Sequence, residues 1–204
     1  MKIDNLKFKI KKRMLNKKFI VKLKEDYQKS QSERRQIISV SNEILHDSKK
    51  TIFALHRGEI KQAEENFKAI EASLQKMENN FGFNRNEDEG SYKAAVEEYV
   101  EAKMFYYYLT GKKIDKIPGV NLDYDSYIGG IADFTGEMVR YATNQAATGN
   151  FAKVAEVKEA INLVIGELID FDLGGYLRTK YDQCRSNLRK IEEMAYEVKL
   201  KTNK

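Results

Sequence analysis

Apolar residues recur every three or four positions along most of the chain, and this spacing predicts amphipathic α-helices. From about residue 26 to residue 57 the apolar stripe consists of Ile37, Val40, Ile44, Ile52 and Leu55. A cation followed by glycine, at Arg57-Gly58, is typical of a helix C-terminus. A second helix is expected over about residues 60–81, marked by Ile60, Phe67, Ile70, Leu74, Met77 and Phe81.

The rest of the chain continues the helical pattern, with breaks rich in glycine and polar residues. A polar loop is expected at 82–90, a connection at 110–123 and a turn at 170–175. Between and after them the pattern predicts helices at about 91–109, 124–148, 151–169 and from the last turn to about 200. No segment alternates with a period of two residues. The sequence therefore predicts an all-α bundle of about six to seven long antiparallel helices.

Length and composition indicate one globular domain preceded by a basic arm. The 204 residues are 42% hydrophobic and 33% charged, with a single proline to interrupt helices. Residues 1–24 contain ten lysine or arginine residues and one acidic residue, whereas 25–204 form the predicted domain. The basic segment, an arm or a helix extension, fits a polyanion such as nucleic acid or an anionic membrane; a solvated extension is the alternative.

Several classes of protein are excluded or disfavoured by simple counts. Cys184 is the only cysteine, which excludes an intrachain disulfide or a cysteine zinc cluster, and its place in a helix indicates a structural role. No run of about eighteen apolar residues is present, so no membrane span or membrane partner is expected. The N-terminal apolar residues are interrupted by lysines, unlike a signal peptide. We therefore expect a cytoplasmic protein.

The helix at 91–109 is apolar around nearly its whole circumference, which predicts burial on most sides. Glu98 and Glu101 nevertheless lie within this surface, about one turn apart on one side of the helix. Buried carboxylates are costly unless they are paired or bind a cation. A shared metal ion is one explanation for the pair, and an exposed, solvated helix face is the other.

The helix at 124–148 contains a second acidic pair, Asp133 and Glu137, spaced to share one face. Arg140 and Asn144 extend this polar stripe. Gly129, Gly130 and Gly136 border it and would allow another backbone or a substrate to approach closely. Four carboxylates from two helices are suitable ligands for Mg²⁺, although acidic pairs at this spacing are also common on solvated faces.

Five segments in order along the chain resemble the translin family, and within it the branch of translin-associated factor X. Glu98–Ala102 resembles the segment with the first acidic pair, and Tyr127–Arg140 resembles the segment with the second. Ser48–Arg57 is similar to the end of the family's first long helix. Tyr181-Asp182 and Lys190–Tyr196 are similar to parts of its final helix. The compact chain is most similar to prokaryotic, especially archaeal, relatives.

The resemblance implies an all-α fold that assembles into a homo-oligomeric shell, expected to be an octamer. Members of the catalytic branch have all four acids, and this chain has Glu98, Glu101, Asp133 and Glu137 at the matching positions. The resemblance thus implies an endoribonuclease that uses Mg²⁺, or Mn²⁺, to cleave single-stranded RNA. The alternatives are a non-catalytic shell that binds RNA or single-stranded DNA, and a structural bundle whose acids face solvent.

Basic side chains would hold RNA through its phosphates. The candidates are Arg57, Arg140, Lys11, Lys12 and Arg13. Arg140 could equally neutralise Glu137. Two further sets of residues have competing interpretations. For His56 we favour hydrogen bonding to carbonyls at the helix end over RNA contact, and for Tyr106, Tyr107 and Tyr108 we favour packing over base stacking.

Overall fold

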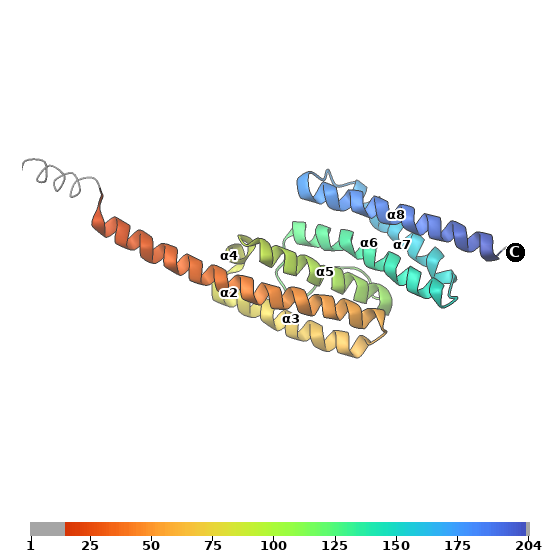
Figure 1. Cartoon of the computed structure of the whole chain (residues 1–204), viewed down its shortest axis with the longest axis horizontal. Coiled ribbons are helices and arrows are strands. Elements are labelled where there is room, and N and C mark those ends of the chain that lie inside the picture. Colours follow the sequence, from red (N-terminus) through yellow and green to blue (C-terminus); the bar gives the residue numbers. More distant parts are fainter. Residues whose placement is uncertain (1–14, 203–204) are drawn as a thin grey trace, which may run out of the picture.

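The protein is described over residues 15–202 by a computed structural model, drawn in Figure 1. Within this range the chain contains seven helices and no strand, so the all-α prediction is confirmed. The helices are α2 (Lys17–His56), α3 (Ile60–Phe81), α4 (Phe83–Glu87), α5 (Gly90–Thr110), α6 (Tyr124–Ala147), α7 (Ala152–Ile169) and α8 (Gly175–Thr202). None of these helices is long and apolar enough to cross a membrane.

Helix α2 begins earlier than the apolar pattern predicts. Its N-cap is Asn16, whose side chain accepts hydrogen bonds from the backbone N–H groups of Lys18 and Phe19 at 3.1 and 3.3 Å. Residues 17–24 of the basic segment are therefore a helix extension, and Figure 1 shows α2 running well beyond the body of the bundle. Lys11, Lys12 and Arg13 lie outside the described residues.

One short element replaces part of an expected loop. Residues 83–87 form the single turn α4 between Gly82 and Asp88, in the segment that the polar composition predicts to be a loop. Gly82 has a φ of 82°, which glycine adopts at little cost, and this reverses the chain between α3 and α4. The loop prediction was wrong here because it rested on polar composition, which usually indicates exposure, whereas Asn86 in this turn is buried.

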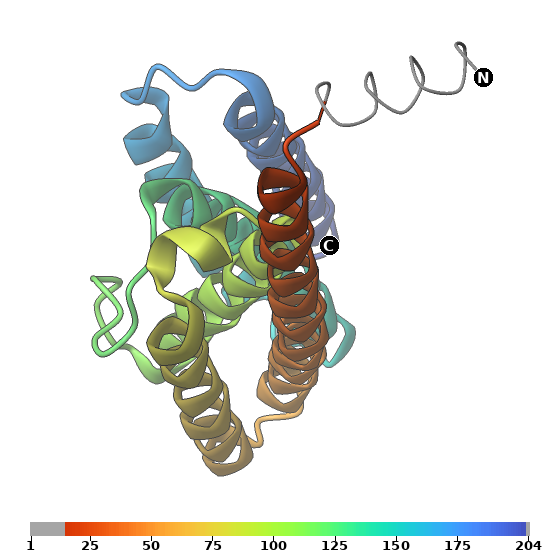
Figure 2. The ribbon, with the colours of Figure 1, turned by 90° about the vertical axis from the view of Figure 1, so that its left-hand side faces the viewer.

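The helices pack in a defined order, visible in Figure 1 and from the end in Figure 2. Helix α5 lies between α2 and α6, α3 packs on α2, and α7 and α8 pack on α6. The pairs α2/α3, α6/α7 and α7/α8 are antiparallel, as expected for consecutive helices with short connections. Helices α2, α5, α6 and α8 run in the same direction. Between them the chain is carried back by α3, by the connection at 111–123 and by α7.

Helix α5 is the centre of the core. Tyr99, Val100, Met104 and Phe105 are all fully buried, as its apolar circumference predicts. On the neighbouring α6, a Cβ atom added at Gly130 would lie 2.6 Å from Val100 Cβ and 2.8 Å from the Glu97 carbonyl oxygen. The absence of a side chain there is what allows α5 and α6 to approach so closely.

Candidate active site

The acidic residues of α5 lie in the half-buried surface that faces α2, α6 and α8. Glu98 lies 3.9 Å from the ammonium of Lys49 on α2, and its side chain is 19% exposed. Burial raises the pKa of Glu98, Lys49 opposes this shift, and the negative charges of Asp133 and Glu137 add to it. The charges of both acids of α6 therefore act on Glu98, although Glu98 belongs to a different helix.

Glu101 is the most buried member of the predicted set. Its carboxyl group makes no ion pair or side-chain hydrogen bond with any other residue in the range 15–202. Burial, and then the charges of Glu98, Asp133 and Glu137, raise its pKa to about 9. A carboxyl group without a counter-cation, surrounded by three others, remains protonated at neutral pH unless a cation neutralises the cluster.

The two acids of α6 already have partners. Asp133 bonds to the ammonium of Lys180 on α8. Burial raises the pKa of Asp133, whereas Lys180 opposes that shift. Glu137 accepts a hydrogen bond from His56 at the end of α2, and Arg140 Nη1 lies 3.3 Å from its carboxylate. Of the two roles considered for Arg140, the structure thus contains the ion pair with Glu137.

His56 has a different partner from the one we favoured from the sequence. Its Nε2 contacts Glu137 instead of a helix-end carbonyl, and its ring packs on Phe105 with centroids 4.7 Å apart. The side chain is only 5% exposed. The other ring nitrogen, Nδ1, is buried without a hydrogen-bond partner among the described residues. Histidine thereby joins α2 to the acidic face of α6.

Sequence reasoning missed two residues of this cluster, Lys180 and Glu97. Lys180 Nζ lies 2.6 Å from Glu97 Oε1 while it also bonds to Asp133. The Tyr176 hydroxyl donates to Glu97 Oε1 at 2.6 Å. Burial opposes the charge on Lys180, but its hydrogen bonds to Asp133 and Glu97 raise its pKa above the usual value. The sequence contained no signal for this contact, because 47 residues separate Lys180 from Asp133.

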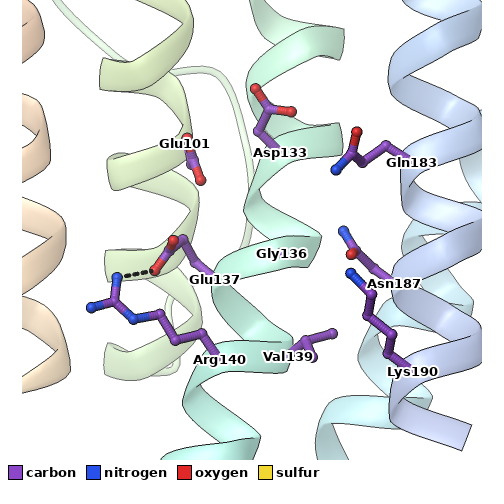
Figure 3. Close-up of a pocket in the computed structure, with 9 residues that line it drawn as sticks. All are labelled: Glu101, Asp133, Gly136, Glu137, Val139, Arg140, Gln183, Asn187 and Lys190. Atoms are coloured by element: carbon purple, nitrogen blue, oxygen red, sulfur yellow. Dashed lines mark hydrogen bonds and ion pairs between the residues drawn. The ribbon is translucent and has the colours of Figure 1, made fainter.

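A pocket of about 410 Å³ opens on the cluster, and Figure 3 shows its lining residues. One part of the wall is formed by Glu101 of α5 and by five residues of α6: Asp133, Gly136, Glu137, Val139 and Arg140. Gln183, Asn187 and Lys190 line it from α8. Lys190 is exposed, and no carboxylate within the described chain forms an ion pair with it. The pocket therefore combines carboxylates with amide and ammonium donors.

Other residues singled out from the sequence lie outside this pocket. Arg57 is exposed and forms a two-pronged ion pair with Glu59, with both N–O distances at 2.8 Å. Tyr106 is buried and donates to Glu64 at 2.5 Å, while Tyr107 and Tyr108 are half-buried. The preference for packing over base stacking is confirmed for Tyr106. Cys184 is fully buried against Ala132, in agreement with a structural role.

The donor set suits a hard divalent cation, which binds oxygen ligands. Glu98, Asp133 and Glu137 are close enough to Glu101 to raise its pKa through their charges. However, Glu98, Asp133 and Glu137 stand in separate ion pairs, and Glu101 stands in none among the described residues. Within residues 15–202, no group of three or more His, Cys, Asp or Glu side chains is already arranged to coordinate a metal ion. Metal binding at this site would therefore require side-chain rotation.

The chain is similar to known helical proteins over most of its length. It is 24% identical over 192 residues to the translin-associated protein X homolog of Schizosaccharomyces pombe, covering 83% of this chain and 82% of that one. It is 26% identical over 94 residues to translin of Gallus gallus, covering 46% of this chain. In that match this chain spans 41% of the length of the Gallus gallus translin.

The fold is also known from solved structures. The structure of the AfC3PO–duplex RNA complex superposes with a TM-score of 0.78 at 22% sequence identity, over 89% of this chain and 96% of that chain. Fold and site together define an all-α bundle with an acidic pocket between parallel helices. The model of the Translin family matches residues 32–202, and the chain belongs to this family. It is a translin-like protein that also resembles translin-associated protein X.

Proposed function

We propose that this protein is a metal-dependent endoribonuclease that cleaves single-stranded RNA. The observation that supports the proposal is the position of Glu101. Its carboxyl group has no partner among the described residues, lines the pocket, and lies within the field of Glu98, Asp133 and Glu137. A Mg²⁺ or Mn²⁺ ion in contact with these four carboxylates would relieve their mutual repulsion.

The four acidic residues would hold the cation, whereas His56 and Arg140 position one of them, Glu137. When bound, Mg²⁺ would supply Lewis-acid chemistry and would lower the pKa of a coordinated water molecule. Glu98, Glu101, Asp133 and Glu137 would hold it. His56 and Arg140 fix the Glu137 carboxylate through two separate bonds. Both bonds are made to the same carboxylate oxygen, Oε2 of Glu137.

RNA would enter the pocket along α8. Lys190 lines the pocket from α8, and the partly exposed Arg140 lines it from α6 on the side of Glu137. Both cations are suited to contact phosphate oxygens. Asn187 already donates to Thr135, whereas Gln183 presents an exposed amide to bases or riboses. The complex of AfC3PO with duplex RNA supports nucleic acid as the ligand class, and single-stranded DNA is a second candidate polymer.

We further propose self-association into a closed shell, with an octamer as the expected form. The described surface contains large exposed apolar side chains, among them Phe19 and Leu23 on the extended part of α2. At the opposite side of the bundle, Leu163 and Ile169 of α7 are 71% and 64% exposed. Such side chains are suited to contacts between subunits. The molar mass in solution, measured by light scattering, tests this proposal.

A non-catalytic protein that binds RNA is the second candidate. The observation that favours it is the pairing of Asp133 with Lys180 and of Glu137 with His56 and Arg140. These ion pairs satisfy two of the four acids without a metal ion. Such a protein would bind RNA equally well with Mg²⁺ or with a chelator, and would not cleave it.

Incubation of the purified protein with end-labelled single-stranded RNA separates the two candidates. We expect cleavage with Mg²⁺, none with excess chelator, and at least a hundredfold loss in Glu101→Gln and Asp133→Asn. Glu159→Gln is the matched control, because Glu159 is an exposed acid of α7 outside the pocket. Full cleavage by Glu101→Gln, in protein of unchanged helicity and oligomeric state, would refute the proposal. Metal-independent binding without cleavage would establish the second candidate.

A further inference from the structure

The ammonium group of Lys180 lies between two carboxylates that come from different helices. Its Nζ bonds to Asp133 Oδ2 on α6 and lies 2.6 Å from Glu97 Oε1 on α5. We propose that this ammonium occupies the position that a second divalent cation would take, so that the site binds a single divalent ion per chain. The inference rests on the proposed metal-dependent function and specifies the number of ions.

The two carboxylates and a phenol form a cation cage that is already complete. The side chains of Lys180, Glu97 and Asp133 are 18%, 13% and 26% exposed, so water has little access to them. The Tyr176 hydroxyl donates to Glu97, and the Tyr176 ring centroid lies 5.1 Å from Lys180 Nζ. An aromatic face at this distance adds a favourable contact for a cation.

The backbone of α6 holds Glu97 in this cage. A Cβ atom added at Gly129 would lie 2.1 Å from Glu97 Oε2 and 2.7 Å from its carboxyl carbon. The Glu97 side chain therefore occupies the space left by the missing side chain and points along α6 toward Asp133. Because both partners of Lys180 are fixed by neighbouring helices, the position between them suits one small cation and is filled by the ammonium.

Asp133 is the residue that connects this cage with the pocket. Its Oδ2 bonds to Lys180, and Asp133 also lines the pocket together with Glu101. In sites with two metal ions, a carboxylate commonly bridges ions that are about 3.5–4 Å apart. Here Oδ2 of Asp133 is already bonded to the ammonium group of Lys180, where a second ion would otherwise bind.

A tethered ammonium competes strongly with a free ion. Lys180 is held beside its partners by the packing of α8 on α6, so its effective concentration at the cage greatly exceeds that of a divalent ion in solution. Its charge also reduces the attraction of a second ion to Asp133 and Glu97. Under the proposed function, Glu98, Glu101, Asp133 and Glu137 would then hold one ion on the pocket side.

Mn²⁺ titration of the full chain tests the inference without reference to cleavage. Isothermal titration calorimetry should give one Mn²⁺ per chain for the wild type, with the six-line electron paramagnetic resonance spectrum of an isolated ion. Lys180→Met should raise the stoichiometry from one to two and broaden the spectrum through coupling between neighbouring ions. Lys180→Arg, which keeps the positive charge, should stay at one.

Glu97→Gln provides the matched controls. In the Lys180→Met background it removes a ligand of the second position, so the stoichiometry should return to one. Two ions in the wild type, or one ion in a folded Lys180→Met variant, would overturn the inference while leaving the metal-dependent function intact. No Mn²⁺ binding by the wild type would overturn both. If Lys180→Met does not fold, as judged by circular dichroism, the wild-type stoichiometry still decides, because two ions there exclude a resident ammonium.

Discussion

His56 at the C-terminus of α2 donates a hydrogen bond to the Glu137 carboxylate of α6, 81 residues further along the chain. This bond spans the end of α5, whose Phe105 ring packs on the imidazole. The contacts of His56 therefore join α2, α5 and α6.

We expect substitutions of His56 to separate its two contacts. His56→Ala loses both the ring packing and the bond, and should lower the free energy of unfolding by about 2–4 kcal/mol. His56→Phe keeps an aromatic ring against Phe105 and should lower it by about 1–2 kcal/mol, because Glu137 loses a buried partner. Urea unfolding followed by circular dichroism measures both values. An unchanged stability of His56→Phe would contradict a contribution from the bond, and equal losses in the two variants would contradict a contribution from the ring packing.

Glu101 should make the stability of the metal-free protein decrease as pH rises. Its pKa is raised from 4.5 to about 9 in the fold, so between these values the folded chain binds a proton that the unfolded chain has released. The resulting slope is at most about 1.4 kcal/mol per pH unit. Glu101→Gln keeps the neutral form at every pH, so it should flatten this dependence and be more stable than the wild type at pH 8.

Thermal or urea unfolding with chelator present, at several values between pH 5 and 9, measures this slope. Glu159→Gln should retain the wild-type dependence, because this exposed side chain lies on α7 away from the cluster. A wild-type stability that rises over this range would contradict a protonated Glu101. Divalent ions should reverse the effect, because they bind the deprotonated carboxylates and release protons.

The close approach of α5 and α6 predicts opposite outcomes for two glycines of one helix. In Gly130→Ala the new Cβ atom would meet Val100 and the backbone of Glu97, so the helices must separate, and we expect a loss of about 1–3 kcal/mol in unfolding free energy. In Gly136→Ala the nearest atom is the Asn187 amide nitrogen at 3.5 Å. That variant should be neutral or gain up to about 1 kcal/mol, because alanine favours helix. Equal effects would contradict this packing.

Lys190 should contribute to RNA affinity if the proposed function holds. Lys190→Gln removes a positive charge at the pocket without touching the carboxylates, and should weaken binding of single-stranded RNA uniformly across sequences. One lost phosphate contact should lower the slope of log affinity against log salt by about 0.7. Fluorescence anisotropy at several salt concentrations measures it. Lys199→Gln, an exposed lysine in the last turns of α8, is the control, and an unchanged slope in Lys190→Gln would contradict phosphate contact there.

The apolar pattern predicted the helices well because burial and helical period are both local properties of the sequence. The apolar circumference of the helix around Val100 and Phe105 correctly indicated a central position. The start of α2 was missed because residues 17–25 form a helix whose apolar side chains, such as Phe19, are exposed and follow no buried stripe.

The site was only partly accessible to sequence reasoning. The acidic pairs of α5 and α6 attracted attention through their spacing, and the structure brings Glu101, Asp133 and Glu137 to one pocket, with Glu98 close by. Lys180 and Glu97 could not be assigned, because a lysine and a glutamate on helices usually face water. Only the packing of α8 on α6 gives them a common position.

The packing of α8 on α6 also sets the order in which the site is completed. Helix α8 follows all the other described helices in the chain, and it contains Lys180, Gln183, Asn187 and Lys190. During synthesis, the acids of α5 and α6 are therefore present before the pocket wall that α8 forms. Until α8 docks, Asp133 has no counter-cation and the pocket has no third side. A chain in which α8 has not yet formed and docked therefore lacks the finished site.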